Sequence, residues 1–89
     1  MDVAKHPVSS VHTREYDALR ALLREIREAK GVSQEELSER LGRPVTYIGK
    51  VELGARRLDV VELLQVCSLL SIEGADFIRR LEQRVRAPS

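Results

Sequence analysis

Three glycines divide the middle of this 89-residue chain into segments of similar length. Gly31, Gly42 and Gly54 each follow a stretch in which apolar residues recur at three- and four-residue steps, the spacing of one face of an α-helix. Because glycine readily adopts the left-handed backbone that closes a helix, the pattern predicts three successive helices that each end at a glycine. The chain has no Trp, two Tyr and one Phe, so its core must consist mainly of Leu, Val, Ile and Ala, which favours helix packing over a sheet. We therefore expect an all-α fold.

Capping residues set the boundaries of the expected helices. Ser33 and Glu36 have the spacing of a capping box, in which each side chain binds a free backbone amide of the opening turn, and Asp59 and Glu62 repeat that spacing. Pro44 suits the first position of a helix, where no amide hydrogen is needed. Together these signals predict helices over about residues 13–30, 33–41, 44–53, 59–71 and 76–86.

The apolar stripes of these helices predict a single small core. The inward-facing residues expected for the five helices in turn are Tyr16, Leu19, Leu22, Leu23, Ile26 and Ala29; Leu37 and Leu41; Ile48 and Val51; Val60, Leu63, Leu64, Cys67 and Leu70; and Phe77, Ile78, Leu81 and Val85. The resulting plan is one domain over residues 13–86, after a loose arm at residues 1–12 and before a frayed tail at residues 87–89.

Positive charge is concentrated on one short stretch. Residues 42–58 carry Arg43, Lys50, Arg56 and Arg57 against Glu52 alone, whereas the parts of the chain before and after this stretch carry seven basic against eight acidic residues and four against five. The formal net charge of +1 argues against a protein that coats nucleic acid indiscriminately. The positive charge is therefore focused on the third expected helix and the turns at its ends.

Several kinds of site are not indicated. Cys67 has no second cysteine, so we expect a small buried apolar residue and neither a disulfide nor a cysteine-based zinc site. His6 and His12 have no carboxylate or cysteine at ligand spacing, so no metal site is expected. No nucleophile with a plausible base and no glycine-rich phosphate loop is present, which predicts a protein without catalysis or cofactor. With no apolar run near the roughly 18 residues of a membrane span and no signal peptide, the expected location is the cytoplasm.

The stretch SQEELSERLGRPVTYIGKVELGARRLDVVELLQVCSLLSI resembles the helix-turn-helix domain of phage-repressor-like (Xre-type) transcription regulators. The residues that carry the resemblance, which spans about residues 19–72, are Ser33 and Gln34, Leu41 and Gly42, Ile48 and Glu52, then Gly54 and a Leu-rich fourth helix. The resemblance implies a compact five-helix, lambda-repressor-like domain with the helix-turn-helix in the second and third helices. In its length the chain is also similar to stand-alone members of the family, among them controllers of restriction-modification systems.

The same resemblance implies how double-stranded DNA would be bound. In that family the second helix lies across the DNA backbone and the third enters the major groove. The base-facing residues would then be Val45, Thr46, Gly49 and Lys50. The phosphate contacts would come from Gln34, Arg43, Tyr47, Arg56 and Arg57. A plainer alternative stays open for four of these residues: Lys50, Arg56 and Arg57 as solvated surface charges, and Tyr47 as an aromatic ring that only covers the turn.

The chain also departs from the family pattern. Val45 and Gly49 stand where the family often has Gln or Ser, so specificity is expected to depend on apolar contacts and on DNA shape. Pro44 replaces the usual Ser or Thr cap, and an anchoring hydroxyl is lost with it. Glu52 is unsuited to a phosphate contact, and the resemblance implies instead that it pairs with Arg27 of the first helix.

Two functions follow as hypotheses. The first is a sequence-specific DNA-binding transcription regulator that acts as a homodimer on a pseudo-palindromic operator. Its symmetric contact would use the fifth helix and the link before it, where the candidate residues are Ile72, Phe77, Ile78 and Leu81, unless they serve only the core. The second is a protein-interaction module, such as an antitoxin or a restriction-modification controller partner, in which DNA binding is secondary.

Overall fold

The computed structural model describes residues 13–87, which form five α-helices and no strand. In chain order the helices are α1 (Arg14–Ala29), α2 (Gln34–Arg40), α3 (Tyr47–Leu53), α4 (Val60–Leu69) and α5 (Gly74–Arg86). The all-α prediction is confirmed, and each expected helix is present. The predicted arm at residues 1–12, with His6 and His12, and the last two residues of the predicted tail lie outside the described residues.

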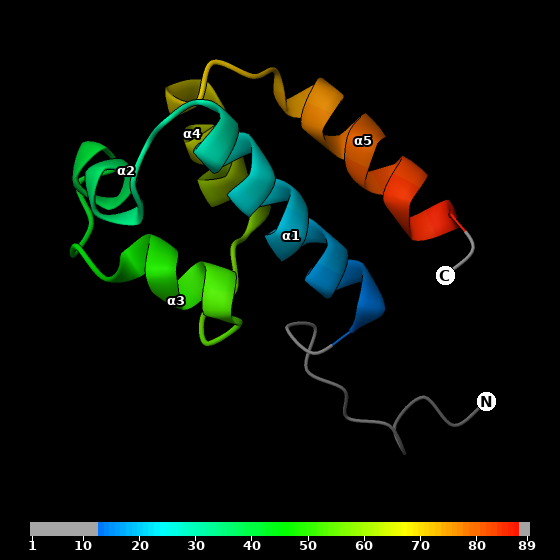
Figure 1. The fold of residues 1–89 in the computed structure, drawn as a ribbon, viewed down its shortest axis with the longest axis horizontal. Helices are drawn as coiled ribbons and strands as arrows, with labels where there is room; N and C mark the ends of the chain where they lie inside the picture. The colour runs from blue at the N-terminus through cyan, green and yellow to red at the C-terminus, as the bar shows by residue number, and fades with distance from the viewer. Residues whose placement is uncertain (1–12, 88–89) are drawn as a thin grey trace.

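The α1 helix lies between α3 and α5 (Figure 1). This helix packs against both α3 and α5, while α2 packs against α3 and α4, and α4 packs against α5. Figure 1 shows α5 alongside α1 at one side of the molecule and the α2–α3 pair at the other. In the part of the chain from residue 13 to residue 87, no helix is long and apolar enough to cross a lipid bilayer.

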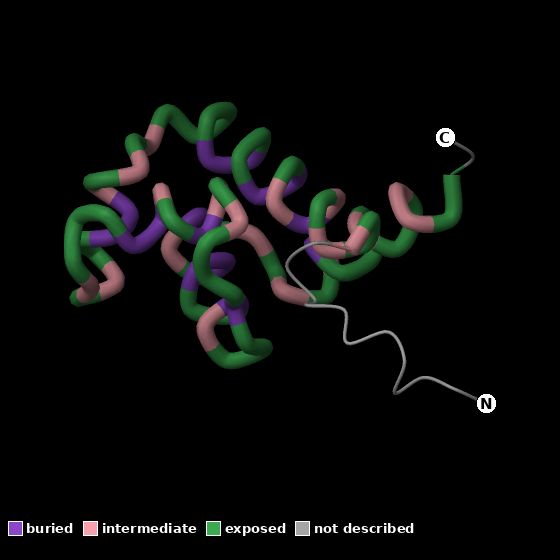
Figure 2. The backbone as a smooth tube through the Cα atoms, turned by 90° about the horizontal axis from the view of Figure 1, so that it is seen from below, coloured by how far each residue is buried: buried purple, intermediate pink, exposed green. Residues whose placement is uncertain are grey.

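The core is built from aliphatic side chains, as the composition predicts. Figure 2 shows the buried segments, in purple, along the inward sides of the helices. The most deeply buried aliphatic residues are Leu23, Leu37, Ile48, Val51 and Val66. At the edge of this core the Tyr16 hydroxyl accepts a 2.5 Å hydrogen bond from the backbone amide of Leu58, which ties α1 to the loop before α4.

The predicted helix starts at Ser33 and Asp59 are confirmed, but only one capping box is complete. Ser33 Oγ accepts a 3.0 Å hydrogen bond from the Glu36 amide, and Asp59 Oδ1 accepts one of 2.7 Å from the Glu62 amide. The Glu62 carboxylate also accepts a 3.0 Å bond from the Asp59 amide, which completes the second box. The Glu36 carboxylate instead pairs with Arg40 at 2.7 Å, because a guanidinium one turn along α2 is a charged donor.

The start of α3 differs from the prediction. The helix begins at Tyr47 rather than Pro44, because residues 44–46 form a turn in which the Tyr47 amide donates a 2.9 Å hydrogen bond to the Pro44 carbonyl. Thr46 occupies the N-cap position, but its side chain makes no capping bond. Instead, Oγ of the fully buried Ser38 on α2 accepts a 3.0 Å hydrogen bond from the Ile48 amide. A neighbouring helix therefore supplies the hydroxyl that the start of α3 lacks.

The inward face predicted for α4 is confirmed at Leu63, Cys67 and Leu70 but is wrong at Val60 and Leu64. Val60 and Leu64, both expected in the core, are 73% and 52% exposed, and Ala29 at the end of α1 is exposed as well. The buried residues on and next to α4 are Leu63, Val66, Cys67 and Leu70. Because α4 is apolar around most of its circumference, periodicity alone did not single out this stripe. The prediction that Cys67 is buried is confirmed.

In α5 the two neighbouring residues Phe77 and Ile78 have opposite environments. Phe77 is 1% exposed and lies in the core, whereas Ile78 is 48% exposed. Ile72 and Leu81 are partly buried and pack against the core. Phe77 therefore offers no surface to a partner, which corrects its predicted place in a symmetric contact. The helix also begins two residues earlier than predicted, at Gly74, since the Phe77 amide donates to the Glu73 carbonyl.

Candidate nucleic-acid interface

The residues predicted to face DNA bases lie together on the outward side of α3 and in the turn before it. Val45, Thr46, Gly49 and Lys50 line one shallow groove with the amino end of α2, represented by Gln34. Lys50 is exposed, and its ammonium group has no hydrogen-bond or ion-pair partner among residues 13–87. The groove thus offers one cation without an ion-pair partner in the described part of the chain, and its lining also includes the acidic Glu35.

Gln34 sits at the border between this groove and the interior. Its side-chain nitrogen Nε2 donates a 2.8 Å hydrogen bond to Glu52 Oε1. Its side-chain oxygen approaches Gly49 so closely that a Cβ atom on Gly49 would lie 3.3 Å from it. The absence of a side chain at Gly49 therefore leaves room for the Gln34 amide beside α3.

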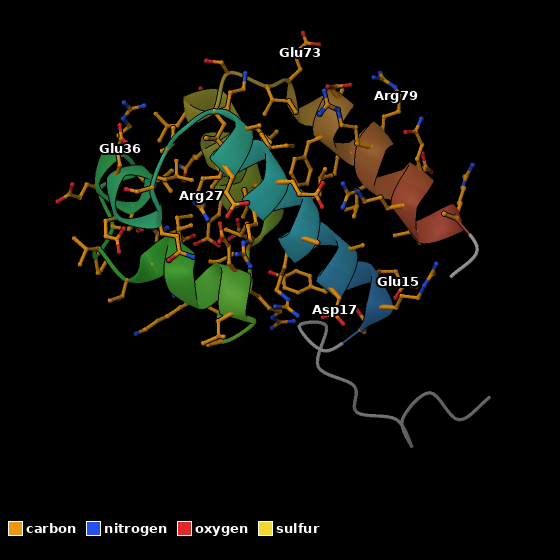
Figure 3. The ribbon with its side chains drawn as sticks, in the orientation of Figure 1. Glu15, Asp17, Arg27, Glu36, Glu73 and Arg79 are labelled. Atoms are coloured by element: carbon orange, nitrogen blue, oxygen red, sulfur yellow. The ribbon has the colours of Figure 1, made fainter. Side chains whose placement is uncertain are left out.

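Beneath the groove, Arg27 and Glu52 form the predicted ion pair between α1 and α3. Arg27 Nε lies 2.7 Å from Glu52 Oε2 and Arg27 Nη2 lies 3.0 Å from Oε1, a two-point contact between side chains that are 9% and 5% exposed. Arg27 Nη1 also donates a 2.8 Å bond to the Val32 carbonyl. Figure 3 shows Arg27 reaching into the space between α1 and the α2–α3 pair. The pKa of Arg27 is raised, chiefly by its hydrogen bonds to Glu52.

On the other side of α3, two arginines stack against Tyr47. The guanidinium carbons of Arg43 and Arg56 each lie 4.9 Å from the centre of the Tyr47 ring, within the range of a cation–π interaction. Each arginine also places an Nη2 atom 3.0 Å from the same oxygen of Glu62, Oε2. Tyr47, predicted as a phosphate contact, is only 5% exposed, because the two guanidinium groups and the core enclose it. Burial raises the pKa of the Tyr47 hydroxyl, and the nearby Glu62 carboxylate acts in the same direction.

These contacts border the exposed face of α3 on two sides. At 3.6 residues per turn, Gly49 and Glu52 lie on one flank of the helix and Tyr47 on the other. Gln34 contacts the first flank, and the Arg43–Arg56 pair covers the second. Arg57, the remaining basic residue of the stretch, is exposed in the loop before α4. The predicted base-facing residues thus lie on the exposed face of α3, with Gln34 and the Arg43–Arg56 pair at its sides, whereas Tyr47 is buried.

Three residues of this surface were missed by the sequence reasoning. Leu53, 78% exposed, and Glu35 line the same groove, and Glu62 joins the two arginines. Leu53 could have been found from its spacing, three residues after Lys50 and four after Gly49. The contact of Glu62 with Arg43 had no sequence signal, because it joins residues nineteen positions apart. In the described part of the chain, no cluster of His, Cys, Asp or Glu side chains could hold a metal ion.

Comparisons with known proteins agree with this geometry. The family described as a helix-turn-helix domain matches residues 18–77. The XRE-family like protein from Pseudomonas syringae pv. tomato str. DC3000 is 39% identical over 84% of this chain and 92% of that chain, with a TM-score of 0.77. The clp gene regulator ClgR from Corynebacterium glutamicum is 29% identical over 81% of this chain and 77% of that chain, with a TM-score of 0.72. No curated protein matches the chain.

A third solved structure is similar in fold. It is the restriction-modification controller protein C.Esp1396I, a tetramer in complex with its natural 35 base-pair operator. The match has 22% identity over 85% of this chain and 100% of that chain, with a TM-score of 0.75. The family match over residues 18–77 and the 39% identical XRE-family like protein show that the chain belongs to the Xre-type helix-turn-helix family of DNA-binding transcription regulators.

Proposed function

We propose that the chain regulates transcription by binding double-stranded DNA sequence-specifically, as a homodimer on a pseudo-palindromic operator. The observation that supports this most directly is the exposed face of α3, where the unpaired Lys50 stands between Gln34 on one flank and the Arg43–Arg56 pair on the other. A helix exposed in this way fits the major groove, whose two edges are rows of phosphates. Such a regulator acts in the cytoplasm, where it meets the chromosome.

Base recognition in this proposal comes from the groove beside α3. Lys50 donates hydrogen bonds to a guanine edge, while Val45 and the Thr46 methyl group contact thymine methyl groups. Gly49 has no side chain to read a base, but it permits a close approach of the DNA to the backbone. With a single charged base-reading side chain, a large share of the specificity would come from DNA shape and deformability.

Phosphate binding is assigned to the two flanks. Gln34 lies at the start of α2, and Arg43, Arg56 and Arg57 offer guanidinium donors suited to phosphate oxygens. Tyr47 is almost fully buried, so in this proposal it contributes mainly by stacking with the two arginines that flank it. These contacts fix the register of the protein on the duplex rather than read its sequence.

Dimerisation is assigned to the outer surface of α4 and α5. Without Phe77, the predicted contact retains Ile78, which is 48% exposed, with Ile72 and Leu81 at its margin. The exposed residues Val60, Val61 and Leu64 add apolar area on α4. Gly74 brings the two helices together, since a Cβ atom on Gly74 would lie 2.5 Å from Leu64. Two copies joined through this surface would present their α3 helices to half-sites about 34 Å apart.

The test is fluorescence anisotropy with labelled DNA from upstream of the chain's own gene and with an unrelated duplex of equal length, at 50 and 200 mM salt. A regulator that neutralises about six phosphates loses affinity on the order of a thousandfold over this range, and it prefers the upstream DNA. Weak, equal binding to both duplexes would reject the proposal and favour the protein-interaction module instead.

A further inference from the structure

Glu62 holds a position that the proposed DNA contacts do not explain. Its side chain is 12% exposed and contacts two more exposed arginine side chains, those of Arg43 at 36% and Arg56 at 44%. One carboxylate oxygen, Oε2, accepts from both arginines, and the other, Oε1, accepts from the Asp59 backbone amide. Glu62 is therefore fixed by the first turn of α4 and in turn contacts both arginines.

The charges of this cluster leave it able to bind an anion. Two guanidinium groups share a single carboxylate, so the cluster keeps a net positive charge. Each guanidinium has five N–H donors and uses one of them for Glu62, and its outer side remains exposed. The Tyr47 ring restricts both groups further, since each stacks 4.9 Å from its centre.

We propose that Glu62 is a positioning residue for DNA binding: it holds Arg43 and Arg56 against Tyr47 in the orientation in which they bind the phosphates of the duplex. The inference rests on the proposed function and adds a role for an acidic residue that would not itself touch DNA. A free arginine side chain loses rotamer freedom when it binds a phosphate, and this loss opposes binding. Because Glu62 and Tyr47 already restrict both side chains in the folded protein, most of that loss is incurred on folding rather than on binding.

Simple electrostatics predicts the opposite effect for this residue. Neutralising an acidic group near a DNA-binding surface raises the net charge of the protein by one unit, which strengthens its attraction to phosphates. If Glu62 only competed with DNA for the arginines, Glu62→Gln would bind DNA more tightly and with a steeper salt dependence. The positioning role predicts weaker binding and a shallower salt dependence. The sign of the change therefore separates the two roles.

The experiment compares the wild-type chain with Glu62→Gln on the upstream duplex, by anisotropy over a series of salt concentrations. A glutamine oxygen can still accept from the Asp59 amide, but its NH₂ group then faces the guanidinium groups and cannot hold them. We expect an affinity loss of about tenfold, since two rotamer-rich side chains become mobile, and a salt slope smaller by the equivalent of up to about two phosphate contacts.

Two control variants test the reason for that loss. Glu35→Gln makes the same change of charge beside the groove. Among the described residues Glu35 forms no close ion pair and interacts with Arg27 only electrostatically, so this variant should bind DNA more tightly than the wild type. Asp59→Ala removes the other half of the capping box but leaves the arginines paired, so it should lose much less affinity than Glu62→Gln.

A third comparison adds Glu62→Gln to the Arg43→Ala/Arg56→Ala variant. Because Glu62 acts through those two arginines, it should have no further effect on DNA affinity there. Equal or tighter binding by Glu62→Gln, or an equal loss in Asp59→Ala, would overturn the positioning role while leaving the proposed function intact. A wild-type chain that shows no salt-dependent preference for the upstream duplex would overturn the proposed function, and the positioning role with it.

Discussion

The hydroxyl of Ser38 on α2 accepts a 3.0 Å hydrogen bond from the backbone amide of Ile48 in the first turn of α3. The same hydroxyl donates a 2.8 Å bond to the Gln34 carbonyl. Amides in the first turn of a helix have no partner within that helix, and the Thr46 side chain at the N-cap makes no capping bond. The two helices of the helix-turn-helix are thus joined by the buried Ser38 hydroxyl, which donates to a carbonyl of its own helix α2 and caps the first turn of α3.

Replacing this hydroxyl should destabilise the fold. Ser38→Ala would leave the Ile48 amide buried without a partner, which costs about 1–3 kcal/mol in free energy of unfolding. Urea unfolding followed by circular dichroism measures the change, and Ser68→Ala, at an exposed serine of α4, is the control with little expected effect. Equal stabilities for the two variants would show that the Ser38 bond contributes nothing.

The Arg27–Glu52 pair should be costly to break and much less costly to replace. Glu52→Leu alone leaves the Arg27 guanidinium buried without its charge partner, and the expected loss of stability is about 3–5 kcal/mol. Arg27→Met/Glu52→Leu removes both charges and should recover most of that loss in the same unfolding assay. As a control, Glu82→Gln breaks the exposed pair with Arg86 and should cost less than about 1 kcal/mol. A double variant no more stable than Glu52→Leu would contradict this account.

Lys50→Ala tests base reading. If Lys50 binds a guanine edge, its loss costs about 1–3 kcal/mol and relaxes the preference at one operator position. If it binds a phosphate, all sequences weaken equally and the salt slope falls by about one contact. Competition among duplexes with single base changes distinguishes these results, and unchanged affinity would remove Lys50 from the interface.

The proposed dimer surface predicts different results for two adjacent residues. Ile78→Glu places a charge on the exposed side of α5, so we expect a stably folded monomer by analytical sedimentation, with weakened DNA binding. Phe77→Arg places a charge in the core and should unfold the chain, as seen by circular dichroism, because an unpaired buried charge is strongly unfavourable. A dimer that persists in Ile78→Glu would move the interface elsewhere.

Stability should fall under acidic conditions. The pKa of Glu62 is lowered, chiefly by the hydrogen bond from the Asp59 amide, and that of Glu25 is lowered, chiefly by its hydrogen bond from Arg84. A carboxyl group whose pKa is lower in the folded than in the unfolded state adds stability above its unfolded pKa of about 4.3, and that stability is lost as pH falls through the folded pKa. Thermal unfolding between about pH 7 and pH 3 should therefore show a decline that starts below about pH 5. The decline should be shallower in Glu25→Gln/Glu62→Gln, and an identical profile would refute this assignment.

Features that depend on residues within a turn of one another could be predicted from the amino-acid sequence. Gly31, Gly42 and Gly54 have φ angles of 71°, 71° and 90°, the left-handed conformation predicted at each helix end. Ser33 and Asp59 cap the helices that they were expected to begin. The reason is that the free amides and carbonyls at helix termini bond to groups a few residues away in the chain. The spacing of such residues can be read directly from the sequence. The resemblance extended this to one distant pair, Arg27 with Glu52.

Which side chains meet across distant segments could be seen only once the chain was folded. Val66, rather than Leu64, faces the core, because α4 is apolar on several sides and its neighbours determine which side is covered. Tyr47 is buried because Arg43 and Arg56 converge on it from both ends of α3, and Glu62 from the next helix draws them together. Electrostatic and packing energies depend on distance in space rather than on position in the chain. The stretch that carries a charge of +3 in the sequence therefore places two of its arginines around Glu62, an acidic residue outside that stretch.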